Sequence, residues 1–107
     1  MAIKGCGDKR TERFLANERV RVFEGFAKAA QKALTRLQAA VVLGDLRSPP
    51  SNRFEALGGE RNGQYSIRIN DKWRVCVRWT PRGGPTDETD LLMIEGDAHD
   101  VEMTDYH

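Results

Sequence analysis

Cysteine and histidine are scarce in this chain. Its two cysteines are Cys6 and Cys76, and its two histidines are His99 and His107. The cysteines have neither metal-ligand nor disulfide-framework spacing, so we expect reduced thiols and no metal site. No hydrophobic run approaches the roughly 20 residues that span a bilayer, and no apolar signal region opens the chain. We therefore expect a cytoplasmic protein without a membrane partner.

Positive charge is missing from the C-terminal part of the chain. Residues 83–107 hold eight acidic and no basic residues, whereas residues 1–52 hold ten basic and five acidic ones and residues 53–82 seven and three. A basic body with an acidic tail suits a surface that binds polyanions. Charge alone, however, is better explained as ordinary surface charge. The length predicts a single domain, 1–107.

The clearest structural pattern lies between Gly63 and Trp79. Apolar and polar residues alternate on both sides of Asn70-Asp71, a pair that favours a turn. The pattern predicts an antiparallel hairpin with an apolar face and an exposed arginine face. The arginine face carries Arg68, Arg74 and Arg78, whose side chains suit the gripping of phosphate oxygens. Solvent-exposed strand faces commonly carry arginine, so the hairpin alone does not establish a phosphate site.

The N-terminal half predicts two helices. The first begins at Asp8 or Thr11 and runs to about Asn17, and the second runs from about Glu18 to Ala40, with Gly44 as its stop. The apolar stripe of the second helix is expected to cover the hairpin. It consists of Phe23, Phe26, Ala30, Leu34, Leu37 and Val41.

Shorter segments are expected to complete the sheet. Phe54 to Leu57 predicts a short strand. Leu91 to Ile94 and Asp100 to Tyr106 can extend or rejoin the sheet, with a turn at Gly96 to Ala98 between them. These elements predict an α+β fold.

Three stretches resemble a known family. They are Asn52 to Leu57 (NRFEAL), the run GGERNGQYSIRINDKWRVCVRW and the ending DVEMTDYH. Together, and in this order, they are similar to the HigB branch of the RelE/ParE toxins. The resemblance implies a RelE-like fold, in which a small, mostly antiparallel sheet packs against two N-terminal helices. It also implies a toxin of a type II toxin–antitoxin system.

The same resemblance implies an activity and partners. HigB-like toxins are ribosome-dependent endoribonucleases that cut messenger RNA, arrest translation and need neither a metal nor an organic cofactor. Their partner is a helix-turn-helix antitoxin of the HigA type. In such a reaction a ribose 2′-hydroxyl attacks the neighbouring phosphate, so a proton must be removed, another supplied and an anionic phosphorane stabilised.

Candidate site residues follow from chemistry and resemblance together. His107 is the proton-transfer candidate because an imidazole titrates near neutral pH. Asp105 is expected to orient it, and Tyr106 to stack on a base or donate to phosphate. Arg74 is the main catalytic cation, and its replacement is expected to abolish cleavage without affecting folding. The expected phosphate-binding residues are Arg68, Arg78, Arg61 and Arg53.

Two departures from the family keep other functions open. Many members carry lysine where this chain has Gly58, and the acidic segment of residues 83–99 is longer than expected. One alternative is a ParE-like toxin that acts on a DNA-processing target without cutting RNA. Another is an inactive module that only binds an antitoxin. The sequence indicates neither codon preference, oligomeric state nor the antitoxin-binding surface.

Overall fold

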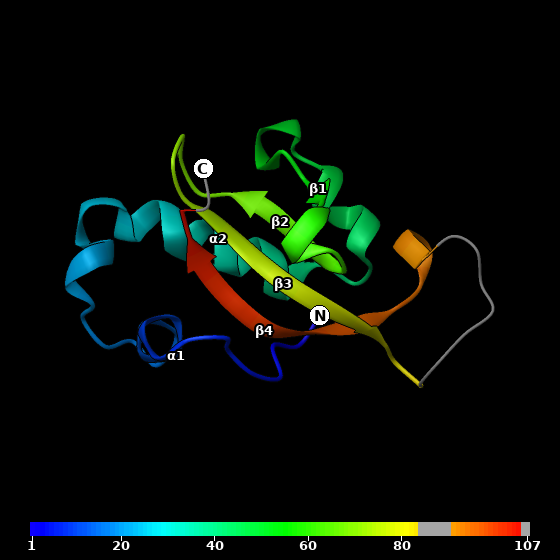
Figure 1. Cartoon of the computed structure of the whole chain (residues 1–107), viewed down its shortest axis with the longest axis horizontal. Helices are drawn as coiled ribbons and strands as arrows, with labels where there is room; N and C mark the ends of the chain where they lie inside the picture. Colours follow the sequence, from blue (N-terminus) through cyan, green and yellow to red (C-terminus); the bar gives the residue numbers. More distant parts are fainter. Residues whose placement is uncertain (84–90, 106–107) are drawn as a thin grey trace.

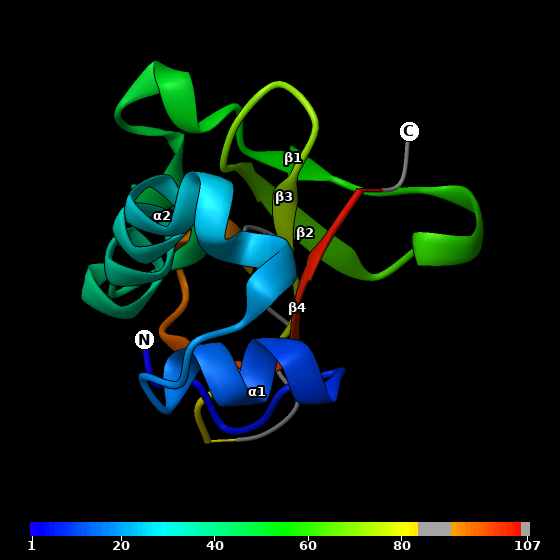
Figure 2. The same cartoon turned by 90° about the vertical axis from the view of Figure 1, so that its left-hand side faces the viewer.

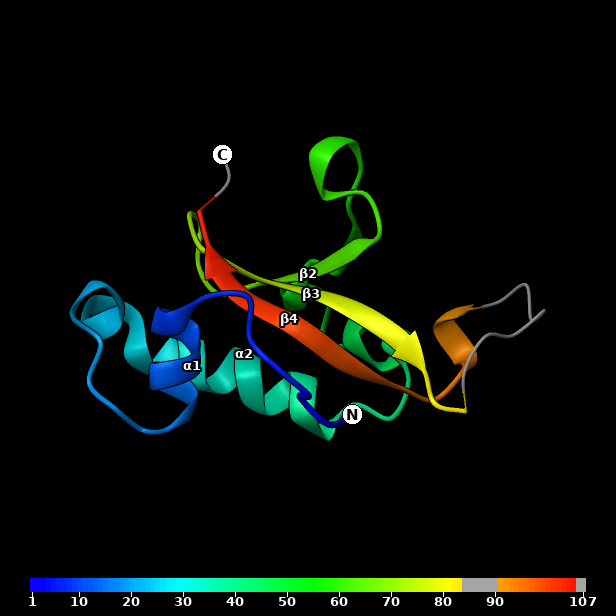
Figure 3. The same ribbon diagram turned by 60° about the horizontal axis from the view of Figure 1, so that its bottom comes forward.

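A four-stranded antiparallel sheet lies against two helices in the computed structural model, which describes residues 1–83 and 91–105. The strands, in spatial order, are β1 (Glu55–Ala56), β2 (Gln64–Arg68), β3 (Arg74–Pro81) and β4 (Gly96–Thr104). Helices α1 (Lys9–Leu15) and α2 (Ala27–Ala39) cover one face of the sheet (Figures 1 and 3). The expected α+β arrangement is confirmed.

The hairpin forms where the alternation predicted it. β2 and β3 pair in antiparallel register, with Ser66 opposite Cys76 and Arg68 opposite Arg74. The Asn70 side-chain oxygen accepts hydrogen bonds from the backbone N–H groups of Lys72 at 2.9 Å and Trp73 at 2.7 Å. The turn is therefore closed by the asparagine chemistry that the sequence suggested.

The first helix is capped as expected. Asp8 accepts a hydrogen bond from the backbone N–H of Thr11 at 2.7 Å. The hydroxyl of Thr11, which is fully buried, in turn accepts one from the backbone N–H of Met103 at 3.0 Å. The first bond caps α1, and the second joins α1 to β4.

The prediction of one continuous helix from Glu18 to Ala40 is wrong. A 3-10 helix, η1 (Arg21–Phe26), precedes α2, and Phe26 leaves the helical conformation with φ −140° and ψ 28°. This break lets Phe23 and Phe26 both contact the ring of Trp73, with centroid distances of 5.7 and 5.2 Å. Aromatic packing across the hairpin therefore overrides the helical period.

The expected helix stop at Gly44 is also wrong. α2 already ends at Ala39, and Gly44 lies within the 3-10 helix η2 (Leu43–Arg47). A Cβ at Gly44 would lie 3.0 Å from the carbonyl oxygen of Leu92. This glycine thus permits a close contact with the chain before β4. Val41, expected in the buried stripe, is 53% exposed because it follows the end of α2.

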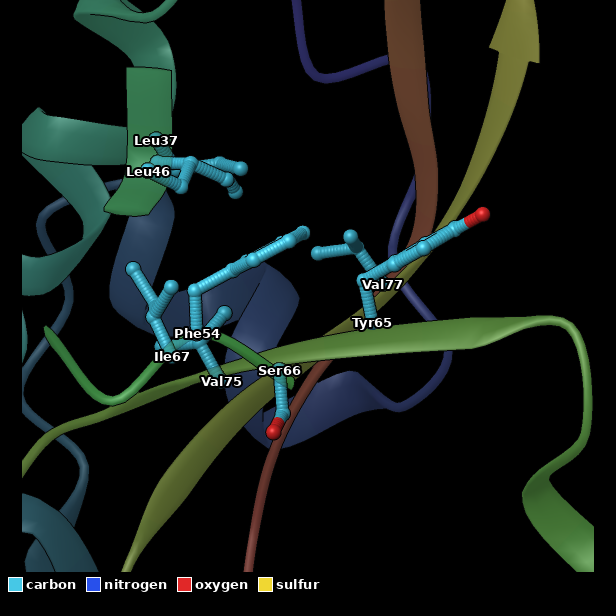
Figure 4. Close-up of a pocket in the computed structure, with 8 residues that line it drawn as sticks. All are labelled: Leu37, Leu46, Phe54, Tyr65, Ser66, Ile67, Val75 and Val77. Carbon is cyan, nitrogen blue, oxygen red and sulfur yellow. The ribbon is translucent and has the colours of Figure 1, made fainter. Parts of the chain in front are cut away.

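Apolar side chains fill the space between the sheet and α2. Figure 4 shows Ile67, Val75 and Phe54 pointing toward Leu37 and Leu46. The rings of Phe54 and Tyr65 stack with centroids 5.8 Å apart. In the same view, Ser66 points to the opposite side of β2. The two faces that the alternation predicted are therefore real.

The prediction of a turn at Gly96 to Ala98 is wrong. Those residues begin a continuous strand, and Leu91–Met93 forms a 3-10 helix, η5, in place of an extended segment. A Cβ at Gly96 would lie 2.2 Å from the indole nitrogen of Trp79, so glycine serves close packing here, not chain reversal. A bulge follows at Asp100, whose φ is +50°.

The N-terminal segment runs beside β4. It forms isolated parallel bridges, which join Ile3 to Ala98 and Cys6 to Val101, in place of a strand. The bulge at Asp100 interrupts the ladder that a longer strand would need. Within the residues that the structure describes, no helix is long and apolar enough to cross a membrane.

Candidate functional site

The polar face of the sheet carries the arginines that the sequence singled out. We define this face by the alternating residues of β2, β3 and β4 that point away from α2. They are Gln64, Ser66, Arg68, Arg74, Cys76, Arg78, Glu102 and Thr104. Strand register brings Arg68, Arg74 and Thr104 into one row. β4 therefore ends beside the two arginines, and the last residues of the chain follow from there.

Arg74 is buried, contrary to the expectation of an exposed arginine face. It is the first residue of β3, and it is only 7% exposed. Its Nε donates to the Ser66 hydroxyl at 2.9 Å, and its Nη2 donates to the backbone carbonyl of Arg53. These bonds use part of the donor capacity of the guanidinium. Arg74 thus holds the segment before β1 against the sheet.

The backbone of Arg53 is shaped for that bond. Arg53 follows the 3-10 helix η3 (Pro50–Asn52) and adopts a left-handed conformation with φ +46°. This conformation turns the chain from η3 toward β1, so that the Arg53 carbonyl accepts from Arg74 while the residue itself stays exposed. The two predicted cations therefore lie together, although Arg53 contributes a carbonyl to the described contact.

The middle of the polar face is covered by the 3-10 helix η4 (Gly59–Arg61). Arg61 Nη1 lies 3.1 Å from a Glu102 carboxylate oxygen and 3.0 Å from the Gln64 amide oxygen. Figure 2 shows η4 on the side of the sheet away from α2. Beneath this cover Cys76 is 1% exposed, and burial raises the pKa of its thiol to about 11. Cys76 is a free thiol, and a raised pKa in a buried place makes such a thiol inert.

Arg68 forms an ion pair at the turn of the hairpin. Its Nη2 lies 2.5 Å from Asp71, whose side chain is 99% exposed. The hydrogen bond from Arg68 lowers the pKa of the Asp71 carboxyl, and the charge of Arg53 adds to this effect. Arg53 and Arg68 are therefore close enough in space to act on the same anion.

The other end of the polar face is more open. Arg78 is paired with Gln64 on β2, and its Nε lies 3.8 Å from Asp100, at the bulge. His99 lies 2.6 Å from the Thr80 hydroxyl and 3.5 Å from Asp100. His99 is half-exposed and bonded to its neighbours, which suits a structural role.

The predicted proton-transfer group lies outside the described residues. Tyr106 and His107 belong to that remainder, so their roles stay predictions. Asp105 is described, and its carboxylate lies 3.6 Å from Lys72 Nζ. Because Thr104 pairs with Arg74, Asp105 follows directly after the row that holds the main cation. The structure thus brings Arg53, Arg68, Arg74 and Asp105 to one end of the sheet, with Arg61 and Arg78 farther along it.

Sequence reasoning missed the acidic and hydroxyl partners of these cations. Ser66 alternates with Arg68 on β2, so its place on the arginine face was readable from the sequence. The pairing of Glu102 with Arg61 joins residues far apart in the chain and gave no local signal. Among residues 1–83 and 91–105, no group of three or more potential ligands from His, Cys, Asp and Glu could hold a metal ion.

Comparison with known proteins identifies the family. The family model described as "RelE-like toxin of type II toxin-antitoxin system HigB" matches residues 5–89. The chain is also 36% identical over 74 residues to Toxin HigB-1 of Vibrio cholerae, covering 67% of this chain and 78% of that protein. An uncharacterized protein of Haemophilus influenzae is 35% identical over 52 residues, covering 49% and 52% of the two chains.

This chain belongs to the HigB-like family of RelE-like toxins, and is thus a toxin of a type II toxin–antitoxin system. Such a system implies an antitoxin as its partner. The match of the family model ends at residue 89, so it includes the hairpin and η4 but not β4. The roles expected at the C-terminal end therefore depend on the chemistry of that end and not on the matched segment.

Proposed function

We propose that this toxin is a ribosome-dependent endoribonuclease that cuts messenger RNA without a metal ion. The observation that supports this most is the row formed by Arg68, Arg74 and Thr104, because it gathers cations where β4 ends. A single RNA strand lying across this row meets fixed guanidinium groups and the final residues of the chain. HigB-like toxins are generally ribonucleases, which agrees with this arrangement.

The proposed reaction moves two protons and exchanges one phosphorus–oxygen bond. The ribose 2′-oxygen attacks the adjacent phosphorus as its proton is removed, and the 5′-oxygen leaves as it is protonated. The products are a 2′,3′-cyclic phosphate and a 5′-hydroxyl. His107 transfers a proton, Asp105 orients the imidazole, and Tyr106 stacks on a base or donates to phosphate.

The cations stabilise the phosphorane and hold the strand. Arg74 is fixed by Ser66 and the Arg53 carbonyl, so its guanidinium is preorganised toward the row. Arg68 bonds an exposed carboxylate that a phosphate can replace. Arg53, Arg61 and Arg78 contact flanking phosphates. In the cell we propose a helix-turn-helix antitoxin of the HigA type as the silencing partner in the cytoplasm.

A second candidate is favoured by Gly58. Many family members carry lysine at this position, and here a Cβ would meet nothing within 4 Å. The proposed RNA site thus lacks the lysine that many family members have, although a side chain at position 58 would have room. A ParE-like toxin that leaves RNA intact, or an inactive antitoxin-binding module, would tolerate this loss. If Gly58→Lys raises cleavage of an already active toxin, the missing cation belongs to the ribonuclease site.

The deciding experiment maps the 5′ ends of messenger RNA on translating ribosomes after adding the toxin. We expect new ends with the wild-type chain and a loss of about 10²- to 10⁴-fold in cleavage rate for His107→Ala, as for removal of a general acid or base. His99→Ala, which alters the other histidine, is the matched control and retains cleavage.

Two outcomes contradict the proposal. Cleavage by His107→Ala at the wild-type rate would show that the imidazole is not the proton-transfer group. Growth arrest without new messenger RNA ends would favour the ParE-like alternative, and neither arrest nor ends would favour the inactive module.

A further inference from the structure

A second group of cations, which shares Arg68 with the row, surrounds a hollow between α2 and the hairpin. The hollow has a volume of about 240 Å³. Lys32 and Arg36 of α2, Ser51 of η3 and Arg68 of β2 contribute to its lining. A water molecule takes up roughly 30 Å³ in the liquid, so the hollow has room for a larger group. The Arg68 side chain reaches it at the edge of the sheet, next to the polar face.

The charge of this hollow is of one sign. None of the residues that line it is acidic. Helix α2 contains no acidic residue, and its three cations Lys28, Lys32 and Arg36 follow each other at intervals of four. Within the described parts of the chain, Lys32 and Arg36 form no ion pair. Arg68 is paired with Asp71 beside the hollow, so the excess of positive charge comes from Lys32 and Arg36. A concave site with an excess of positive charge attracts an anion.

One wall of the hollow is held in place from below. Arg36 Nη1 donates to the Asn52 side-chain oxygen at 2.8 Å, and Asn52 is only 1% exposed. The Asn52 amide nitrogen donates to the carbonyls of Leu46 at 3.1 Å and Ser48 at 3.3 Å. A buried, fully anchored amide thus fixes the guanidinium at the rim. This loss of side-chain freedom before binding is the mark of a prepared site.

The hollow is continuous with the row at the end of the sheet. Ser51 lies two residues before Arg53, whose carbonyl accepts from Arg74. Arg68 belongs both to the row and to the lining of the hollow. A polyanion that lies along the row can therefore reach Lys32 and Arg36 through Arg68, which belongs to both.

We propose that this hollow binds a phosphodiester of single-stranded RNA, outside the linkage that is cut. The choice of RNA as ligand rests on the proposed ribonuclease function, whereas the anion site itself rests on the geometry. Guanidinium groups and a serine hydroxyl are typical phosphate partners. The RNA phosphate takes the place of the Asp71 carboxylate on Arg68, because that carboxylate is held only at the surface.

The test measures RNA binding separately from cleavage. The probe is a single-stranded oligonucleotide with 2′-O-methyl riboses, which provides phosphates but no attacking hydroxyl. Its fluorescence anisotropy is followed over a range of salt concentrations for Lys32→Gln, Arg36→Gln and the double variant. Lys28→Gln is the matched control, because it removes the same charge from an exposed position of α2 that does not line the hollow.

We expect the double variant to bind about tenfold more weakly and its salt slope to fall by about 0.7 for each phosphate that the variant no longer binds. The control retains wild-type affinity within about twofold. Arg36→Gln removes the hydrogen bond to Asn52 and can therefore affect folding. Lys32 is exposed and has no such bond, so Lys32→Gln tests the hollow without disturbing the fold. If Lys28→Gln and Lys32→Gln weaken RNA binding equally, the proposal is overturned, because RNA would then be attracted by the overall charge of α2 and not by the hollow.

A second arm distinguishes the source of the phosphate. Binding to vacant ribosomes and to ribosomes carrying the methylated messenger is compared for the same variants. A loss confined to the free oligonucleotide and the programmed ribosome indicates messenger RNA, and a loss on vacant ribosomes indicates ribosomal RNA. No RNA binding in either arm, or unchanged RNA binding with lost antitoxin binding, contradicts the RNA pocket. If RNA binds through the hollow but is never cut, only the proposed function fails.

Discussion

On the α2 side of β3, Val75 and Val77 are closed off by apolar side chains, whereas on the other side Arg74 and Cys76 are buried under polar ones. Neighbouring residues of one strand are therefore buried by different means. The apolar face excludes water through helices and rings. The polar face is covered by η4 and by hydrogen-bonded or charged side chains around Arg61 and Arg74.

The two faces of the sheet stabilise the fold in different ways, and only the polar face presents groups suited to a binding site. Apolar burial is non-directional, so the first face loses stability mainly when buried side-chain volume is removed. The stability of a buried polar group depends on each of its hydrogen-bond partners, since a buried donor left without an acceptor lowers the free energy of unfolding. Groups of the second face are thus fixed in position by their partners, which suits a site that must hold phosphates.

The largest effect should come from the apolar face. Phe23 is fully buried and contacts Phe14 and Trp73 edge to face. We expect Phe23→Ala to lower the free energy of unfolding by about 3–5 kcal/mol. Val22→Ala is the matched control, since Val22 is 41% exposed, and should stay within about 0.5 kcal/mol. Urea unfolding checks both, and equal losses would show that Phe23 is not a core anchor.

The apolar face was also the part most readily predicted from sequence. Alternation around Asn70 gave both strands of the hairpin and their faces, because period-two patterns depend only on neighbouring residues. The break at Phe26 was not predictable in this way, since it depends on the distant ring of Trp73. The role of Gly96 was missed for the same reason: only the packed Trp79 shows why a glycine is required there.

The place of several candidate residues on the sheet was predicted from sequence, but their contacts were not. Arg68, Arg74 and Asp105 do gather at one end of the sheet, as alternation and the chain order suggested. The burial of Arg74 was not foreseen, because the Arg53 carbonyl that it binds belongs to a segment before β1. Long-range polar partners leave no periodic trace in a sequence, and Glu102, which pairs with Arg61, was missed on these grounds. Asp71, which pairs with Arg68, lies only three residues away and was missed although it is local.

The second prediction concerns Arg74 and separates structure from catalysis. Because it bonds Ser66 and the Arg53 carbonyl beneath the surface, Arg74→Ala should not leave folding intact. We expect a loss of about 2–3 kcal/mol in the free energy of unfolding, from buried partners of a charged group left unpaired. Arg78→Ala, at the open end of the same face, should change unfolding by less than about 0.5 kcal/mol.

Both arginine variants are measured by urea unfolding and by messenger RNA cleavage at a temperature where each is folded. If Arg74→Ala unfolds at the wild-type midpoint, the bonds to Ser66 and Arg53 carry no stability. If Arg74→Lys folds normally and cleaves normally, a point charge suffices and the fixed guanidinium is not needed.

The smallest effect tests the cover of the polar face through Cys76. A thiol with a pKa of about 11 in the folded chain faces an unfolded value near 8.5. Between these values the unfolded chain releases a proton that the folded chain keeps, so stability falls as pH rises. At pH 10 we expect the wild type to have lost about 1–2 kcal/mol through this group, relative to pH 8. Cys76→Ala lacks this loss, so the difference between the two unfolding curves should shrink toward alkaline pH. A difference that stays constant from pH 8 to pH 10 would mean that η4 does not shield the thiol, and that the polar face is open to water.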